Sequence, residues 1–183
     1  NHDGAMLVRI EGRGFTTDEA VVQGGIDKIE GNDGNDTALG GIGADLINGD
    51  DPLGGGTAAN PGDDILVGDQ GLIHFQNGAR VRVVTTDASD LLGGNDTIKG
   101  NAKNDIILGG VGSDDLSGGL DNDIILGDEG ELLWNLDADF VRGRADVAFV
   151  TLDAGATTLD RVSTIAPTLG AGDMIRGDEG NDI

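Results

Sequence analysis

The sequence contains no cysteine and no tyrosine, and its aromatic residues are four phenylalanines and one tryptophan. Without cysteine, the chain has neither a disulfide framework nor a thiolate metal site. No apolar run approaches the roughly 18 residues that a membrane-spanning helix needs. Basic residues are also scarce, 11 against 34 acidic ones, and the net charge of −23 has the wrong sign for nucleic-acid phosphates or anionic lipids. Two classes remain: an acidic disordered segment, or a repeat fold whose acidic residues hold cations.

Glycine is the residue in excess, 34 of 183, but it does not recur every third residue as collagen requires. It follows a nine-residue frame in which aspartate is sixth and an aliphatic residue is usually eighth. Copies of this frame begin at Val22, Gly31, Gly40, Ala59, Leu91, Gly100, Gly109, Gly118, Thr168 and Gly177. A generic disordered polyanion would not place its acid in such a frame, so a repeat fold is favoured.

The copies fall into three blocks, and a more apolar insert precedes each block. We predict a first unit over residues 1–70 (insert 5–21, repeats 22–67), a second over 71–129 (insert 72–90, repeats 91–126) and a third over 130–183 (insert 131–167, repeats 168–183). A turn containing Asp-Gly or Asp-x-Gly precedes each insert: His2-Asp3-Gly4, Gly68-Asp69-Gln70-Gly71 and Gly127-Asp128-Glu129-Gly130. Because the third block stops within a repeat, we expect the sequence to belong to a longer tandem array, with any secretion signal outside it.

The frame resembles the RTX repeat, GGxGxDxUx, in which U is a large aliphatic residue. Two copies depart from it, with Ala38 at an aliphatic position and Asp121 where glycine is expected. The resemblance implies an all-β fold, namely a parallel β-roll with multiple Ca²⁺ ions in its turns, interrupted here by β-hairpin inserts. We expect about eight ions. The expected metal ligands are the sixth-position aspartates: Asp27, Asp36, Asp45, Asp64, Asp96, Asp105, Asp114, Asp123, Asp173 and Asp182.

Elementary chemistry supports this assignment. Glycine permits the positive φ of tight turns, and Ca²⁺ takes about six to eight oxygens from carboxylates and carbonyls. The residues after each turn would form a short strand with one inward side chain, from the set Ile29, Ile47, Leu66, Ile98, Ile107, Leu116, Ile125 and Ile175. Two such side chains per coil are too few to offset the entropy of ordering the coil, so calcium binding should be coupled to folding.

With two repeats per coil, turns on one edge of the roll recur every 18 residues. This spacing pairs Asp27 with Asp45, Asp96 with Asp114, and Asp105 with Asp123. The partner position of Asp36 falls in an irregular stretch. We expect loop 52–61 to bulge out so that Asp64 takes that position.

The inserts hold all five aromatic residues and seven of the 11 basic ones; their net charge is −4, against −19 for the rest. Their alternating patterns predict hairpins, with Asn77-Gly78 as the turn between Leu72–Phe75 and Arg80–Thr86. A second hairpin is predicted between Ala5–Ile10 and a strand beginning at Phe15. Leu132–Val150 predicts a longer hairpin followed by a loop to 167. Hairpins this short need a surface to pack on: the roll, each other or another molecule.

Other chemistries are not supported, and we do not expect an enzyme. Neither histidine belongs to a nucleophile motif. The pairs Asp63-Asp64 and Asp114-Asp115 could suggest a glycosidase, but the repeat explains them better. Glycosylation triplets at Asn35 and Asn95 lie inside repeat turns, where we interpret them as structural.

We therefore expect a calcium-stabilised structural or assembly segment of an extracellular or cell-surface bacterial adhesin, surface-layer, matrix or filament protein. Proteins that resemble it are often exported by type I secretion. Its partners would be copies of itself or neighbouring tandem units, contacted through the inserts, rather than nucleic acid or a membrane. Two alternatives stay open: the carrier module of a secreted toxin or hydrolase, and a carbohydrate-binding module that uses insert aromatics such as Trp134.

Overall fold

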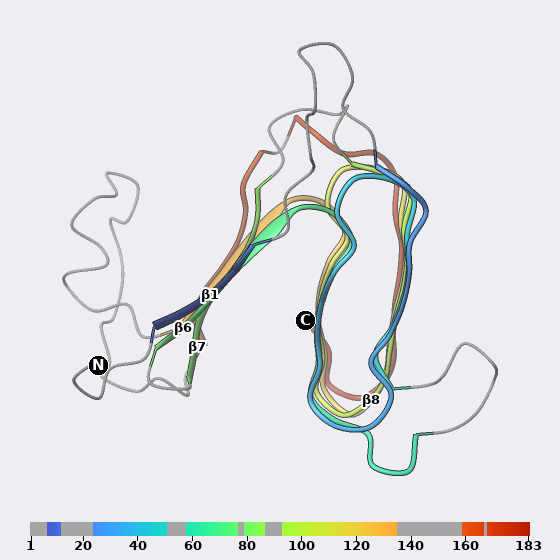
Figure 1. The fold of residues 1–183 in the computed structure, drawn as a ribbon, viewed down its shortest axis with the longest axis vertical. Coiled ribbons are helices and arrows are strands. Elements are labelled where there is room, and N and C mark those ends of the chain that lie inside the picture. The colour runs from blue at the N-terminus through green and yellow to red at the C-terminus, as the bar shows by residue number, and fades with distance from the viewer. Residues whose placement is uncertain are drawn as a thin grey trace.

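The computed structural model describes residues 7–11, 24–50, 58–76, 79–86, 93–134, 159–166 and 168–183. Every regular element in these ranges is a β-strand, β1 to β14, and they form three sheets. None of the described residues belongs to a helix that is long and apolar enough to cross a membrane. Two of the sheets are parallel and make the roll, and the third is antiparallel and lies beside it (Figure 1).

The roll consists of two walls between which the chain alternates (Figure 1). We call the first the open sheet; its order is β14 (Met174–Glu179), β10 (Asp115–Leu120), β8 (Thr97–Ala102), β4 (Leu46–Asn48) and β2 (Lys28–Glu30). We call the second the covered sheet; its order is β11 (Ile124–Leu126), β9 (Ile106–Leu108), β5 (Ile65–Val67) and β3 (Thr37–Leu39). All pairings within both sheets are parallel, which confirms the predicted β-roll.

The space between the walls is filled by one side chain per strand, at the eighth position of the frame. The buried members of this core are Ala38, Ile47, Leu66, Ile98, Ile107, Leu116 and Ile125, with Ile29 packed against them. Ala38, the departure from the aliphatic rule, therefore still points inward. Ile175 is the exception among the predicted core residues, because β14 is the outermost strand of its sheet and leaves this side chain 49% exposed.

The inserts contribute the third sheet, which we call the hairpin sheet. Its order is β1 (Leu7–Glu11), β6 (Gly71–Gln76), β7 (Ala79–Thr85), β12 (Gly130–Trp134) and β13 (Leu159–Thr164), and all its pairings are antiparallel. The β6–β7 pair confirms the hairpin predicted around residues 77–78. The prediction for the third insert was wrong in part, because 159–164, expected to be a loop, pairs with β12. The rest of the hairpin predicted for the first insert lies outside the described residues.

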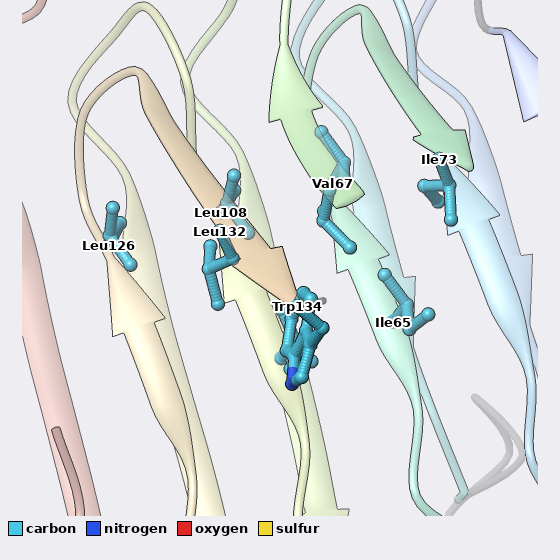
Figure 2. Close-up of a cluster of buried hydrophobic side chains, with 9 residues drawn as sticks. Ile65, Val67, Ile73, Leu108, Leu126, Leu132 and Trp134 are labelled. Carbon is cyan, nitrogen blue, oxygen red and sulfur yellow. The ribbon is translucent and has the colours of Figure 1, made fainter. Parts of the chain in front are cut away.

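The hairpin sheet packs on the outer face of the covered sheet, as Figure 2 shows. In β5, Leu66 points into the roll while Ile65 and Val67 point outward, and all three are buried. These outward side chains join a second apolar cluster, whose buried members are Ile65, Val67, Ile106, Leu108 and Leu126 from the roll and Ile73, Val83, Leu132 and Trp134 from the hairpin sheet. The covered sheet is thus apolar on both faces, and the inserts pack on their own roll.

Candidate metal centre

The predicted aspartates form two columns, one along each edge of the roll. The first column is Asp27, Asp45, Asp96, Asp114 and Asp173; the second is Asp36, Asp64, Asp105, Asp123 and Asp182. Within each column, the backbone N–H of one aspartate donates to Oδ1 of the aspartate in the next coil, at 2.7–3.0 Å. The four predicted pairings are confirmed, including Asp36 with Asp64. The structure therefore brings together all ten predicted site residues as two ladders.

In most of the column aspartates, the second carboxylate oxygen has no hydrogen-bond partner. Oδ2 is buried and unpaired in six members of the columns: Asp36, Asp45, Asp64, Asp105, Asp114 and Asp123. A buried charged oxygen without a partner is costly, and six repeats of one defect in equivalent positions need a common compensating group. Asp27 and Asp182, at two of the column ends, are exposed.

Each unpaired oxygen lies against the glycine that opens its own turn. A Cβ on Gly31 would stand 2.6 Å from Oδ2 of Asp36 and would also collide with the carbonyl oxygen of Gly49 in the next coil. The same arrangement recurs at Gly100, beside Asp105 and the carbonyl of Gly118. Carboxylate and carbonyl oxygens that converge in this way are the ligands that Ca²⁺ takes. The residues present therefore fit a hard cation at the turns, and a side chain at the first position would fill the space.

The backbone conformation of the turns explains the second glycine of the frame. At the second position of the six uninterrupted turns, φ lies between 71° and 116°. Glycine adopts this conformation without strain, and asparagine and aspartate tolerate it better than other side chains. The six residues are Asn32, Gly41, Asn101, Gly110, Gly119 and Asp178.

Burial changes the acidity of the interior aspartates. It raises the pKa of Asp105 to about 8 and that of Asp64 to about 7, with neighbouring carboxylates adding to the rise. Burial likewise raises the pKa of Asp114 and of Asp123 to about 6. The amide that each carboxylate accepts acts in the opposite direction but does not cancel the effect of burial. A nearby dication would favour the charged form and reverse these shifts.

The carboxylates do not cluster. Within the described ranges, no three Asp, Glu or His side chains converge on one point. Since neighbours in a column are one coil apart, a cation in these turns would take most of its oxygens from backbone carbonyls. That requirement matches the short, glycine-rich turns.

The comparison with known families agrees with this geometry. Residues 23–51 and 92–130 match the family described as RTX calcium-binding nonapeptide repeat (4 copies). The chain carries RTX repeats. These repeats bind calcium at multiple sites, so the two aspartate columns belong to a calcium-binding structural segment. The chain matches no curated protein and no solved structure.

Outside the columns, other candidate residues of the RTX segment have structural surroundings. Alternation along the chain separates Asp114 from Asp115, which is exposed and pairs with Arg176 at 2.7 Å. Asp63, beside Asp64, accepts the backbone and side-chain amides of Asn104. Neither pair therefore places two carboxylates in one pocket.

An amide ladder at the fifth position of the frame was missed by the sequence analysis. Along the second column, Oδ1 of Asn104 accepts the backbone N–H of Asn122, and Oδ1 of Asn122 accepts that of Asn181. Asn35 and Asn95 do the same for Asp63 and Ser113. This agrees with the structural interpretation of both glycosylation triplets. The recurrence of asparagine immediately before the aspartate was the available signal.

Proposed function

We propose that this chain is a calcium-stabilised structural segment of an extracellular bacterial adhesin, surface-layer, matrix or filament protein. The observation that carries the proposal is the pair of columns with six buried, unpaired Oδ2 atoms, those of Asp36, Asp45, Asp64, Asp105, Asp114 and Asp123. Without a cation these atoms oppose the fold, and with a cation they hold successive coils together. The segment would act by its stiffness rather than by chemistry, and we propose no catalytic role.

The ligands that we propose are the ten column aspartates, each contributing Oδ2 beside the carbonyl oxygens of its turn. The unpaired Oδ2 atoms and the glycine contacts support this assignment. Eight bound Ca²⁺ ions, our approximate count from the number of turns, would offset most of the formal charge of −23. This neutralisation would let acidic coils stack without mutual repulsion.

The thinness of the inner core supports coupling between calcium and folding. Each coil buries two eighth-position side chains between the walls. At about 1.5–3 kcal/mol per buried aliphatic side chain, this contribution is smaller than the entropy cost of ordering a coil of two repeats. The apolar cluster under the hairpin sheet adds stability only after the covered sheet has formed. Calcium would therefore supply the remaining free energy of folding.

The experiment is circular dichroism of the chain in EDTA and in millimolar calcium. We expect a largely disordered chain in EDTA and a cooperative gain of β-structure with calcium. Magnesium is the control and should substitute poorly, because it prefers a tighter octahedron and retains its waters. A spectrum that is the same in EDTA and in calcium would contradict the proposal.

The ligand assignment has its own test. Asp105→Ala should lower the number of calcium ions bound per chain, measured by equilibrium dialysis, and broaden the folding transition. Asp115→Ala is the matched control, because Asp115 is exposed and lies outside the columns. Equal losses of bound calcium in the two variants would contradict the assignment.

Assembly with copies of the chain or with neighbouring units through the inserts remains part of the proposal. The two described aromatic residues of the inserts, Phe75 and Trp134, pack on their own roll, so an intermolecular contact would use other insert residues. Sedimentation velocity with and without calcium tests this point. We expect calcium-dependent association, and a monomer under both conditions at high protein concentration would contradict it.

A further inference from the structure

Among the described residues, three turns of the roll are interrupted, and in each the contact between the first glycine and Oδ2 of the column aspartate is kept across the interruption. In an uninterrupted turn the first glycine lies against Oδ2 of the aspartate five residues later, as for Gly109 and Asp114. At the interruptions the same contact joins residues that are far apart in the sequence. It joins Gly49 to Asp64, Gly68 to Asp96, and Gly127 to Asp173. Other contacts must therefore hold the half of the turn before the interruption next to the half that follows it.

At the second interruption, Asp69 makes this connection. It directly follows Gly68, and it is fully buried. Its Oδ1 accepts the backbone N–H of Gly94, at the fourth position of the re-entering half-turn, at 3.1 Å. Its Oδ2 accepts the backbone N–H of Val111, at the third position of the next coil, at 2.6 Å. One carboxylate thus joins the exit, the re-entry and the neighbouring coil.

The first interruption repeats this pattern on the other edge of the roll. Asp50 is 1% exposed, and its Oδ1 accepts the backbone N–H of Gly62, again at the fourth position of the re-entering half-turn, at 2.8 Å. Its Oδ2 accepts the backbone N–H of Ala102, again at the third position of the next coil, at 3.1 Å. Two interruptions of different length, the loop after Asp50 and the insert after Asp69, therefore use the same two hydrogen bonds.

At the third interruption, Asp128 occupies the position that corresponds to Asp50 and Asp69. Burial raises the pKa of the Asp128 carboxyl, and the backbone N–H of Ala171, at the fourth position of the re-entering half-turn, has the smaller, opposite effect of lowering it. Oδ1 of Asp128 is buried and has no hydrogen-bond partner among the described residues. The β14 coil that follows this turn is the outermost one, so no described residue supplies the third-position amide.

The second position behaves differently where the turn is continuous. There the residue has positive φ, whereas Asp50, Asp69 and Asp128 do not. Asp178 is the informative case, since it is an aspartate at the second position of an uninterrupted turn. It is exposed, its φ is 71°, and its Oδ2 accepts Ser117 Oγ on the surface. The buried, bridging carboxylates of Asp50 and Asp69 thus occur at interrupted turns, whereas Asp178 at an uninterrupted turn is exposed and makes no such bridge.

We propose that Asp50, Asp69 and Asp128 are positioning residues that reassemble an interrupted turn so that a calcium ion can bind there. The inference rests on the calcium-binding function proposed above and assigns these three carboxylates a role distinct from that of the column aspartates. The column aspartates offer Oδ2 to the cation. Asp50 and Asp69 instead use both oxygens to bind backbone amides across the interruption, and Asp128 stands at the equivalent position of the third interruption.

The first test compares Asp69→Asn with Asp178→Asn in the full chain. Asparagine has one acceptor oxygen, so Asp69→Asn leaves one buried amide unpaired, which should lower the folding equilibrium constant at fixed calcium about 10- to 100-fold. Asp178→Asn should change it less than about threefold. At saturating calcium, equilibrium dialysis should give the same number of ions for both variants and the unaltered chain. Asp69→Asn should need a higher calcium concentration than Asp178→Asn to reach half-saturation, and equal half-saturation concentrations for the two variants would overturn the positioning role.

The second test separates positioning from general destabilisation. Deleting residues 52–61 joins Gly49-Asp50-Asp51 to Gly62-Asp63-Asp64 and restores a continuous nine-residue frame without a proline after Asp50. In that chain the second position needs positive φ, which asparagine adopts at Asn32 and Asn101. Asp50→Asn should therefore lower the folding constant about 10- to 100-fold in the full chain and less than about threefold in the deleted chain. Equal losses in both backgrounds would overturn the inference.

The proposed function and this inference fail separately. If the unaltered chain gains no structure with calcium, the function is wrong. If the unaltered chain folds with calcium but Asp50→Asn and Asp69→Asn behave like Asp178→Asn, only the inference is wrong.

Discussion

The covered and open sheets of the roll are built from one frame, yet their outer faces differ. Flanking the inward residue, the covered sheet has Ile65 and Val67 in β5 and Ile106 and Leu108 in β9, all at most 4% exposed. The corresponding positions of the open sheet include exposed charges, such as Lys99 in β8 and Arg176 in β14. The eighth-position side chains thus form the core inside the roll. The side chains at the seventh and ninth positions determine whether the outer face of a wall is apolar enough for another sheet to pack on it.

The difference also assigns a role to the inserts. A continuous apolar wall of this kind would be an adhesive patch if it were left in water. The hairpin sheet removes it from solvent with Ile73, Val83, Leu132 and Trp134. At one margin, the guanidinium of Arg80 lies 4.5 Å from the ring centroid of Trp134. The inserts are therefore part of the folding unit of this RTX segment.

The largest expected effect comes from a charge on the covered face. Leu108→Asp places a carboxylate between two sheets, and we expect a loss of at least about 4 kcal/mol in the calcium-bound state. Lys99→Asp, at the same ninth position on the open face, should change stability by less than about 1 kcal/mol. Urea unfolding followed by Trp134 fluorescence measures both. Similar losses would mean that the two faces are equivalent.

Inside the roll, the two walls should behave alike. Leu66 of β5 and Leu116 of β10 are both fully buried at the eighth position. Leu66→Ala and Leu116→Ala should each lower the free energy of unfolding by about 2–5 kcal/mol. A difference of more than about 2 kcal/mol between them in urea unfolding would show that the hairpin sheet also controls the inner core.

Asp105 and Asp114, one from each column, should contribute differently to the pH dependence of stability when calcium is absent. Asp105, before the covered strand β9, has a folded pKa of about 8, and Asp114, before the open strand β10, has one of about 6, against 3.8 for the unperturbed group. Because these pKa values are raised, the calcium-free fold gains stability as the pH falls below them. The gain is complete below about pH 4 and is lost as the pH rises through 6–8.

We therefore expect β-structure in EDTA to increase between pH 8 and pH 4. Asp105→Asn should weaken this dependence more than Asp114→Asn, as measured by circular dichroism. A calcium-free chain that loses structure on acidification would contradict the assigned shifts.

The smallest effect should come from the exposed amide ladder. Asn122→Ala removes the acceptor for the backbone and side-chain amides of Asn181 and should cost about 0.5–1.5 kcal/mol. Ser113→Ala, at the same fifth position on the first column, should be neutral within about 0.5 kcal/mol. Thermal unfolding in calcium distinguishes them, and two neutral variants would make the ladder irrelevant to stability.

Much of the site followed from local periodicity. The sixth-position aspartates, the inward residues and the pairing of Asp36 with Asp64 could all be read from an 18-residue repeat, because each coil repeats the contacts of the previous one. The bridging role of Asp69 could not. Its amide partners are at Gly94 and Val111, separated from it by 25 and 42 residues, and no period connects them.

The hairpin sheet shows the same limit. Asn77-Gly78 marks a hairpin through its turn chemistry alone, but the pairing of β7 with β12 joins inserts of different units. The strand at Leu159–Thr164 lacks a clear alternating signal and is stabilised by its register against β12. The apolar seventh and ninth positions of alternate repeats did indicate that another sheet covers one wall of the roll. This pattern is visible only when the repeats of the two walls are compared separately.

The sequence by itself determined a calcium-binding β-roll with aspartates at its turns and one aliphatic residue per strand inside, because these features repeat with a short period and depend on neighbouring residues. Only the tertiary structure decided that strands of the inserts form one antiparallel sheet, that this sheet covers one wall, and that three described turns are closed across the segments that interrupt them. Those outcomes depend on contacts between segments distant in the chain, where burial of apolar surface and pairing of buried amides select one arrangement.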